Sequence, residues 1–192
     1  MKQRSDFNFI QIETSFILLE DNTMKKTALI LTLTALFAST VFAEPQTLKE
    51  NEIEDIVIKI HNEADQGGYE LLSVTELNQL LTSKENFVLI DAHPKAQFDA
   101  AFIDGADNFE FQGTFTHKWN EDAPGGSQDA YKALLGDNLN RKVVVYCGGN
   151  KCGRSNTAAL WAKELGYHHV FRVTSGIKGW QDAGLPVKTT QK

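Results

Sequence analysis

The sequence predicts an α/β fold in which a central, mainly parallel β-sheet is flanked by helices on both faces. Three observations support this prediction. Short, continuous apolar runs that fit buried strands occur at residues 86–93, 142–147 and 168–174. Segments with helical spacing of apolar residues lie between these runs, and glycine or proline ends most of them. Strands that alternate with helices are typical of a parallel sheet with helices on its faces.

The first half of the predicted domain begins with helices. Residues 47–68 carry apolar side chains at helical spacing and stop at Gly67 and Gly68. Ser73 and Glu76 form a capping-box pair, which predicts a second helix over residues 73–83. The remaining elements of this half are a buried strand at 86–93 and, over 94–111, a helical turn, a loop and a short extended piece.

The second half continues the alternation after a long polar loop at residues 112–129. This length is unusual for a connection in a compact domain, so the loop is either functional or a tolerated insertion. The elements predicted after it are a helix at 130–139, a strand at 142–147, a helix at 155–167, a strand at 168–174, and a short helix and turn at 176–187.

Composition and charge exclude some classes of function. The chain has 192 residues, of which 42% are hydrophobic and 23% charged, as expected for a globular domain with its own core. Its formal net charge is -6, and it contains no long basic run. Neither nucleic acid nor an anionic membrane surface is therefore an expected partner.

The N-terminal region predicts export. Lys25 and Lys26 precede an uncharged, largely apolar run from residue 27 to residue 43, which ends in Val41-Phe42-Ala43. This pattern predicts a signal peptide at residues 24–43 with cleavage after Ala43, and hence a periplasmic or secreted protein. A membrane anchor is the alternative, because the run is at the lower length limit for a spanning helix.

The domain boundaries follow from these elements. Residues 1–23 are interpreted as an over-long start or an extension, because they are acidic, unlike the first part of a signal peptide. The predicted divisions of the rest are the signal peptide, an N-terminal helical extension at 44–72 and the α/β domain at 73–190.

Both cysteines of the chain lie in the loop that joins the strand at 142–147 to the following helix. Backbone N–H groups and the positive end of a helix dipole favour an anion at such a position, and glycines let several amides turn inward. These features stabilise a thiolate and predict that Cys147 is a nucleophile facing an anionic substrate. The residues predicted to hold that substrate are Gly148, Gly149, Asn150, Lys151, Gly153 and Arg154, the last with a permanent charge and a planar fork suited to oxyanions.

Three segments resemble the rhodanese-like sulfurtransferases, in the same order along the chain. The loop and helix "YCGGNKCGRSNTAALWAKELGY" are similar to that family's active loop of Cys, Gly, Arg and Ser. The segments "VLIDAHPKAQFDAAFIDGADN" and "VTSGIKGWQDAGLPV" are similar to its first strand region and its closing region. The resemblance implies a rhodanese-like fold and a cofactor-free sulfur transfer. In that reaction Cys147 takes a sulfane sulfur from a small anionic, thiosulfate-like donor and passes it as a persulfide to a thiol or cyanide-like acceptor, or to a protein.

The loop departs from the family's pattern, and the departure involves Cys152. Six residues separate Cys147 from Arg154, two more than is usual in the family. Three roles for Cys152 stay open: a resolving or redox thiol that reacts with Cys147, half of a structural disulfide, or a bystander. In addition, His93 and Phe102 stand where the family usually has Arg and His.

Several other side chains have predicted supporting or structural roles. Asp91 is expected to cap local amides or to order the loop, and Ser155 is expected to support the loop at the start of the helix. Trp180 is predicted to be a core residue. Surface positions are expected for His117 and Trp119, with a place at the active-site mouth as the alternative. A partly exposed edge pair is expected for His168 and His169, with a metal site as the alternative.

Other classes of function remain possible on the same residues. One alternative is a thiol–disulfide or redox-sensing protein that uses Cys147 and Cys152. Another is a phosphatase-like enzyme, and a third is a rhodanese-fold module without catalysis. No metal-ligand spacing, phosphate-binding glycine loop or Ser-His-Asp pattern occurs in the sequence.

Overall fold

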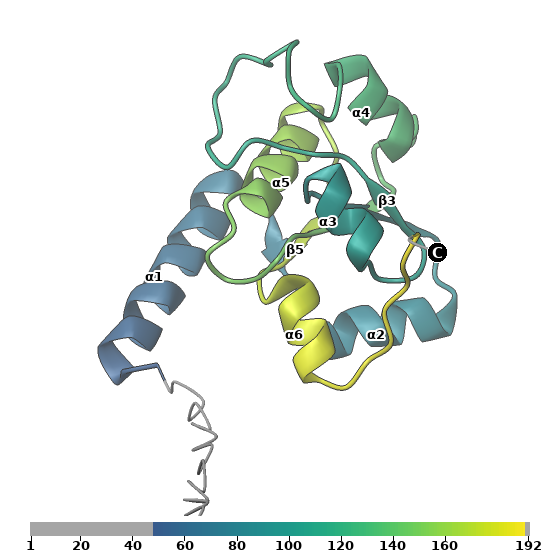
Figure 1. The fold of residues 1–192 in the computed structure, drawn as a ribbon. Coiled ribbons are helices and arrows are strands. Elements are labelled where there is room, and N and C mark those ends of the chain that lie inside the picture. Colours follow the sequence, from purple (N-terminus) through teal and green to yellow (C-terminus); the bar gives the residue numbers. More distant parts are fainter. Residues whose placement is uncertain (1–47, 191–192) are drawn as a thin grey trace, which may run out of the picture. The chain divides into compact units, whose positions relative to one another are not determined.

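The computed structural model describes residues 48–190 and contains a five-stranded sheet in the order β1-β5-β4-β2-β3, in which every pairing is parallel (Figure 1). The strands are β1 (Glu70–Leu71), β2 (Phe87–Asp91), β3 (Ala106–Asn108), β4 (Lys142–Tyr146) and β5 (Val170–Val173). The predicted α/β fold with a parallel sheet is thereby confirmed. The predicted signal peptide and residues 1–23 lie outside the described residues.

The central strand β4 divides its side chains between two cores. Val143 and Val145 pack into one hydrophobic cluster, while Val144 and Tyr146 pack into the other. This alternation follows from the two-residue period of a strand. All four side chains are fully buried, which explains why the sequence here is a continuous apolar run.

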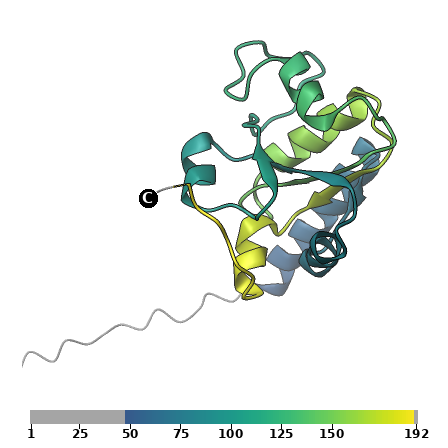
Figure 2. The same cartoon turned by 90° about the vertical axis from the view of Figure 1, so that its right-hand side faces the viewer.

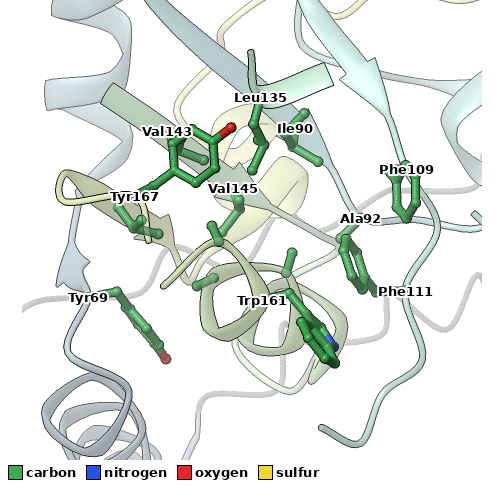
Figure 3. Packing of buried hydrophobic residues seen from close by; sticks show 14 of the residues in the cluster. Tyr69, Ile90, Ala92, Phe109, Phe111, Leu135, Val143, Val145, Trp161 and Tyr167 are labelled. Atoms are coloured by element: carbon green, nitrogen blue, oxygen red, sulfur yellow. The ribbon is translucent and has the colours of Figure 1, made fainter. Parts of the chain in front are cut away.

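Helices cover both faces of the sheet (Figure 2). They are α1 (Glu50–Gly67), α2 (Val74–Ser83), α3 (Lys95–Ala100), α4 (Gln128–Leu135), α5 (Arg154–Glu164) and α6 (Gly176–Asp182). Residues of α1, α4 and α5 share a cluster with Val143 and Val145, whose packing is drawn in Figure 3. Residues of α2 and α6, including the predicted core residue Trp180, share the cluster on the other face.

Local signals fix the beginnings of two helices. The Ser73 hydroxyl accepts a hydrogen bond from the N–H of Glu76, and the Glu76 carboxylate accepts from the N–H of Ser73, so the predicted capping box is present. The Ser127 hydroxyl caps α4 in the same way by accepting from the N–H of Ala130.

The structure corrects the prediction at two places. Strand β1 was not predicted, because two residues are too few to show a period; it forms by pairing Glu70 and Leu71 with β5. Trp119, predicted to lie on the surface, is half-buried and packs on Trp161 of α5 with the ring centroids 4.8 Å apart. The 112–129 loop is therefore anchored on α5, while its His117 is exposed and pairs with Glu164.

Candidate functional site

The candidate site lies at the edge of the sheet where the parallel strands end. Cys147 follows β4, the loop of residues 148–153 comes next, and α5 begins at Arg154. Asp91 ends the neighbouring strand β2 and pairs in register with Tyr146, the residue before Cys147. Ligands of open α/β sheets bind at this carboxyl edge.

The first turn of α6 holds the beginning of the loop. The N–H of Ile177 donates to the carbonyl of Cys147 over 2.8 Å, and the N–H of Lys178 donates to the carbonyl of Gly148 over 3.1 Å. Gly176 makes this approach possible: its φ is +57°, and a Cβ there would lie 2.0 Å from the Cys147 carbonyl oxygen.

The orientation of these two carbonyls determines where the next amides point. In a trans peptide the N–H is opposite to the carbonyl, so the N–H groups of Gly148 and Gly149 point away from α6. Within residues 48–190, neither N–H donates to another group. The N–H of Cys152, in contrast, donates to the Gly149 carbonyl over 2.9 Å.

Cys147 and Cys152 form a disulfide across the loop, with their Cα atoms 6.3 Å apart. Of the three roles considered for Cys152, the resolving or redox thiol and the structural disulfide both require this contact between the two sulfurs. Cys147 is 1% exposed and belongs to the hydrophobic core cluster, whereas Cys152 is only partly buried. Cys147 is therefore a core residue as well as the first residue after β4.

Arg172, which sequence reasoning missed, connects the loop to three other parts of the molecule. It is fully buried in β5. Its Nη2 donates to the carbonyl of Cys152 over 3.1 Å, and its Nε donates to the hydroxyl of Ser155 over 3.0 Å. Its Nη1 donates to the carboxylate of Glu63 in α1 over 2.6 Å and to the hydroxyl of Tyr69 over 3.0 Å. The available signal was one charged residue in the apolar run 168–174.

These contacts change the titration of the groups around Arg172. Burial pushes the pKa of Glu63 up, but hydrogen bonds from Arg172 and Lys59 and their positive charges outweigh it, so that the pKa lies below its ordinary value. Burial raises the pKa of the Tyr69 hydroxyl, and the charge of Arg172 offsets this only in part. Glu63 is therefore ionised at neutral pH and compensates the buried charge of Arg172.

Arg154 and the polar loop residues differ in burial. Arg154 is partly buried, and its buried Nε has no hydrogen-bond partner among the described residues. Asn150 and Lys151 are exposed, and Lys151 forms no ion pair within the described part of the chain. Gly153 packs against the 112–129 loop so closely that a Cβ would lie 2.1 Å from the carbonyl oxygen of Gly113.

Asp91 bonds to a local amide, which is one of the two roles considered for it. Its carboxylate accepts from the N–H of His93 over 2.9 Å, and the same oxygen lies 2.8 Å from Nδ1 of the His93 ring. The other side of that buried ring faces the loop, because a Cβ on Gly148 would lie 3.1 Å from Nε2. His93 thus occupies the space that the missing side chain of Gly148 leaves.

The described residues offer neither a metal site nor a membrane-spanning helix. Among residues 48–190, no group of three or more His, Cys, Asp or Glu side chains is placed to hold a metal ion. Within the same range, no helix is both long enough and apolar enough to cross a membrane.

Comparisons with known proteins agree with this arrangement. The profile of the family described as "Rhodanese-like domain" matches residues 73–183. The chain is 34% identical over 105 residues to the thiosulfate sulfurtransferase GlpE of Actinobacillus succinogenes, an alignment that covers 55% of this chain and 78% of that protein.

Among solved structures, the chain is similar to the polysulfide-sulfur transferase homodimer of Wolinella succinogenes, with 19% identity and a TM-score of 0.49. That match covers 74% of this chain and 94% of the other. It is also similar to the BH2092 protein of Bacillus halodurans, with 20% identity and a TM-score of 0.49, over 74% of this chain and 88% of the other.

Proposed function

Because this chain belongs to the rhodanese-like domain family, we propose that it is a sulfurtransferase that carries sulfur on Cys147. The observation that supports this proposal best is the position of Cys147, at the carboxyl end of the central strand and at the start of a loop whose first amides are free to bind an anion. The 34% identical thiosulfate sulfurtransferase supports the same class of reaction.

In the proposed reaction the reduced Cys147 thiolate attacks the sulfane sulfur of a small anionic donor such as thiosulfate. The donor's S–S bond breaks, its electron pair leaves with sulfite, and Cys147 becomes a persulfide. The N–H groups of Gly148 and Gly149, with the charge of Arg154, would hold the anionic donor and stabilise the thiolate. A thiol or cyanide-like acceptor then attacks the outer sulfur and regenerates the thiolate.

We further propose that Cys152 resolves the persulfide. The disulfide shows that the Cys152 sulfur reaches the Cys147 sulfur in this fold. Attack of the Cys152 thiol on the inner sulfur would form that disulfide and expel the outer sulfur as hydrosulfide. The same bond also supports a second candidate function, a thiol–disulfide protein in which the two cysteines exchange electrons with a partner and carry no sulfane sulfur.

Mass spectrometry of the reduced protein distinguishes the two functions. After incubation with thiosulfate, wild type should gain about 32 Da, the mass of one sulfur. Cys147→Ser should show no gain, since it removes the nucleophile. Cys152→Ser should load normally and keep its persulfide longer, because the resolving thiol is gone.

The possible results have different consequences. A gain on Cys147→Ser would mean that Cys152 is the nucleophile. No gain in either wild type or Cys152→Ser, with reversible loss of about 2 Da from wild type on mild oxidation, would favour the thiol–disulfide function instead. Equal persulfide decay in wild type and Cys152→Ser would contradict the resolving role.

A further inference from the structure

A groove of about 500 Å³ lies beside the cysteine loop. One wall consists of the loop itself, from Gly148 to Cys152, together with Lys178 at the start of α6. The facing wall consists of Leu48 and Ile56, from the segment that contains α1. Figure 1 shows the loop before α5 between the N-terminal half of α1 and α6. This volume lies within the usual range for small-molecule sites and is large for an inorganic anion such as thiosulfate.

The wall formed by α1 is anchored to the rest of the domain. Ile60 and Ala64 of the helix are buried, and Glu63 pairs with the buried Arg172. Arg172 in turn bonds to the carbonyl of Cys152, so the helix and the loop are tied to the same residue. The family profile begins at residue 73, and the apolar wall therefore comes from a segment outside that match.

The groove gives access to one end of the disulfide. Cys152 lines it, whereas Cys147 is 1% exposed. In thiol–disulfide exchange the attacked sulfur must be accessible, and the better leaving thiolate is displaced more readily. Access favours attack on Cys152. The amides of Gly148 and Gly149 favour Cys147 as the leaving thiolate.

The lining also defines the chemistry of the attacking molecule. Leu48 and Ile56 present apolar surface, and Leu48 is 47% exposed although it borders a reactive loop. Lys151 and Lys178 add positive charge at the loop's side, while the acidic residues of the first turns of α1 do not line the groove. A thiol with an apolar carbon stem and a negatively charged group complements this combination.

We propose that the groove binds a small organic thiol of this class, which attacks Cys152 and releases Cys147. The thiolate forms a mixed disulfide with Cys152, the Cys147–Cys152 bond breaks, and its electron pair stays on Cys147 as the thiolate. A second thiol attacks the thiol-derived sulfur of the mixed disulfide, leaving Cys152 as a thiolate and releasing the oxidised disulfide of the two thiols. The inference rests on the proposed function, because it restores the Cys147 thiolate that sulfur transfer requires.

Two thiols that differ only in the apolar stem test the proposal. The oxidised full-length protein is mixed with 3-mercaptopropionate or with 6-mercaptohexanoate at one pH. The rate of disulfide loss is followed by acid quenching, alkylation and mass spectrometry. Each rate is divided by that of the same thiol with a small soluble disulfide, which removes differences in intrinsic reactivity. Wild type should favour the longer thiol about fivefold, which is the order expected when roughly one of the added methylenes is buried against the apolar wall.

Matched variants assign that preference to the groove. In Leu48→Ser and Ile56→Ser, the ratio of the two normalised rates should fall toward 1. Ile58→Ser should retain it, because Ile58 is an exposed residue of the same helix that does not line the groove. Leu48 lies near the helix start and is exposed, so its substitution leaves the fold intact even where Ile56→Ser does not. Lys151→Gln should slow both thiols by a similar factor.

The mixed disulfide identifies the attacked sulfur. When the reaction is quenched early, the adduct should be on Cys152 and the alkylating label on Cys147. An adduct on Cys147, or equal preference for the longer thiol in wild type, Leu48→Ser and Ile56→Ser, would overturn the inference. This exchange needs no sulfane donor, and the sulfur-loading assay needs no disulfide, so failure of the groove and failure of the proposed sulfur transfer give different results.

Discussion

Arg172 is the residue that couples the candidate site to the rest of the fold. A fully buried guanidinium is costly unless it is paired and hydrogen-bonded. Here its partners are the carboxylate of Glu63, two hydroxyl groups and the carbonyl of Cys152. One of these partners, the carbonyl of Cys152, belongs to the loop. A change in the ion pair between Arg172 and Glu63 should therefore also change the position of Cys152.

At this residue scale, Glu63→Gln should destabilise the protein. It should also make the free energy of unfolding depend less on pH in the acid range. The substitution removes the charge that compensates Arg172, with an expected cost of about 1–3 kcal/mol at neutral pH. The pKa of Glu63 is lowered by folding. Its stabilisation is therefore complete above its ordinary value of 4.5 and is lost as the pH falls through the lower, folded value.

Chemical denaturation between pH 3 and pH 7 measures this difference. Wild type and Glu63→Gln should differ most at neutral pH and converge at the acid end. Glu54→Gln is the matched control, because Glu54 is an exposed residue of the same helix. A constant difference between wild type and Glu63→Gln at every pH would show that the charge of Glu63 is not what stabilises Arg172.

At the scale of elements, the cysteine loop is held between α6 on one side and the 112–129 loop on the other. The two contacts differ in kind. The α6 contact uses two N–H donors. The 112–129 contact is the close approach of Gly153 to the carbonyl of Gly113. That long loop is anchored on α5 by its own Trp119, so the packing of this side chain fixes its position.

Gly153→Ala should therefore destabilise the domain and disturb the cysteine loop. A Cβ at this position would lie 2.1 Å from the Gly113 carbonyl oxygen, a backbone atom that cannot move alone. Overpacking of this kind costs about 1–3 kcal/mol. Gly113→Ala is the matched control, since a Cβ there meets nothing within 4 Å. Urea denaturation and sulfur loading of both variants provide the measurements. If the two variants had equal stability and equal loading, the close contact between Gly153 and Gly113 would be contradicted.

At the scale of the whole molecule, the disulfide adds stability without joining distant parts of the chain. Cys147 and Cys152 are separated by five positions, so the bond closes a short loop. Loop-closure entropy for such a span stabilises the folded state by about 2 kcal/mol. The long-range organisation comes from the parallel sheet and its two cores.

Reduction should accordingly leave the fold intact and lower its melting temperature by about 4–8 °C, as a loss of this size does in domains of this length. Circular dichroism of the oxidised and reduced protein gives the two temperatures. The Cys147→Ser/Cys152→Ser double variant should melt near the reduced protein and should not respond to reductant. Loss of helical signal at 25 °C on reduction would show instead that the bond is needed for the fold.

The fold class and the location of the reactive loop could be predicted from the sequence, because both depend on local patterns. The run Val143–Tyr146 is apolar on both faces of a buried strand, and Ser73 with Glu76 fixes a helix start through contacts three residues apart. Cys147 follows the buried strand directly, so its place at the sheet edge follows from the strand. The family resemblance rests on the same segments, which the profile match confirms.

Only the tertiary structure decided how the loop is held, bonded and approached. Arg172 and Glu63 are 109 positions apart, and no local pattern indicates which buried charge will meet which carboxylate. The apolar wall of the groove, the contact of Gly153 with Gly113 and the burial of Cys147 likewise join segments that only packing brings together. The physical reason is that periodicity records which face of an element is buried, whereas the partner of that face is set by the arrangement of all elements.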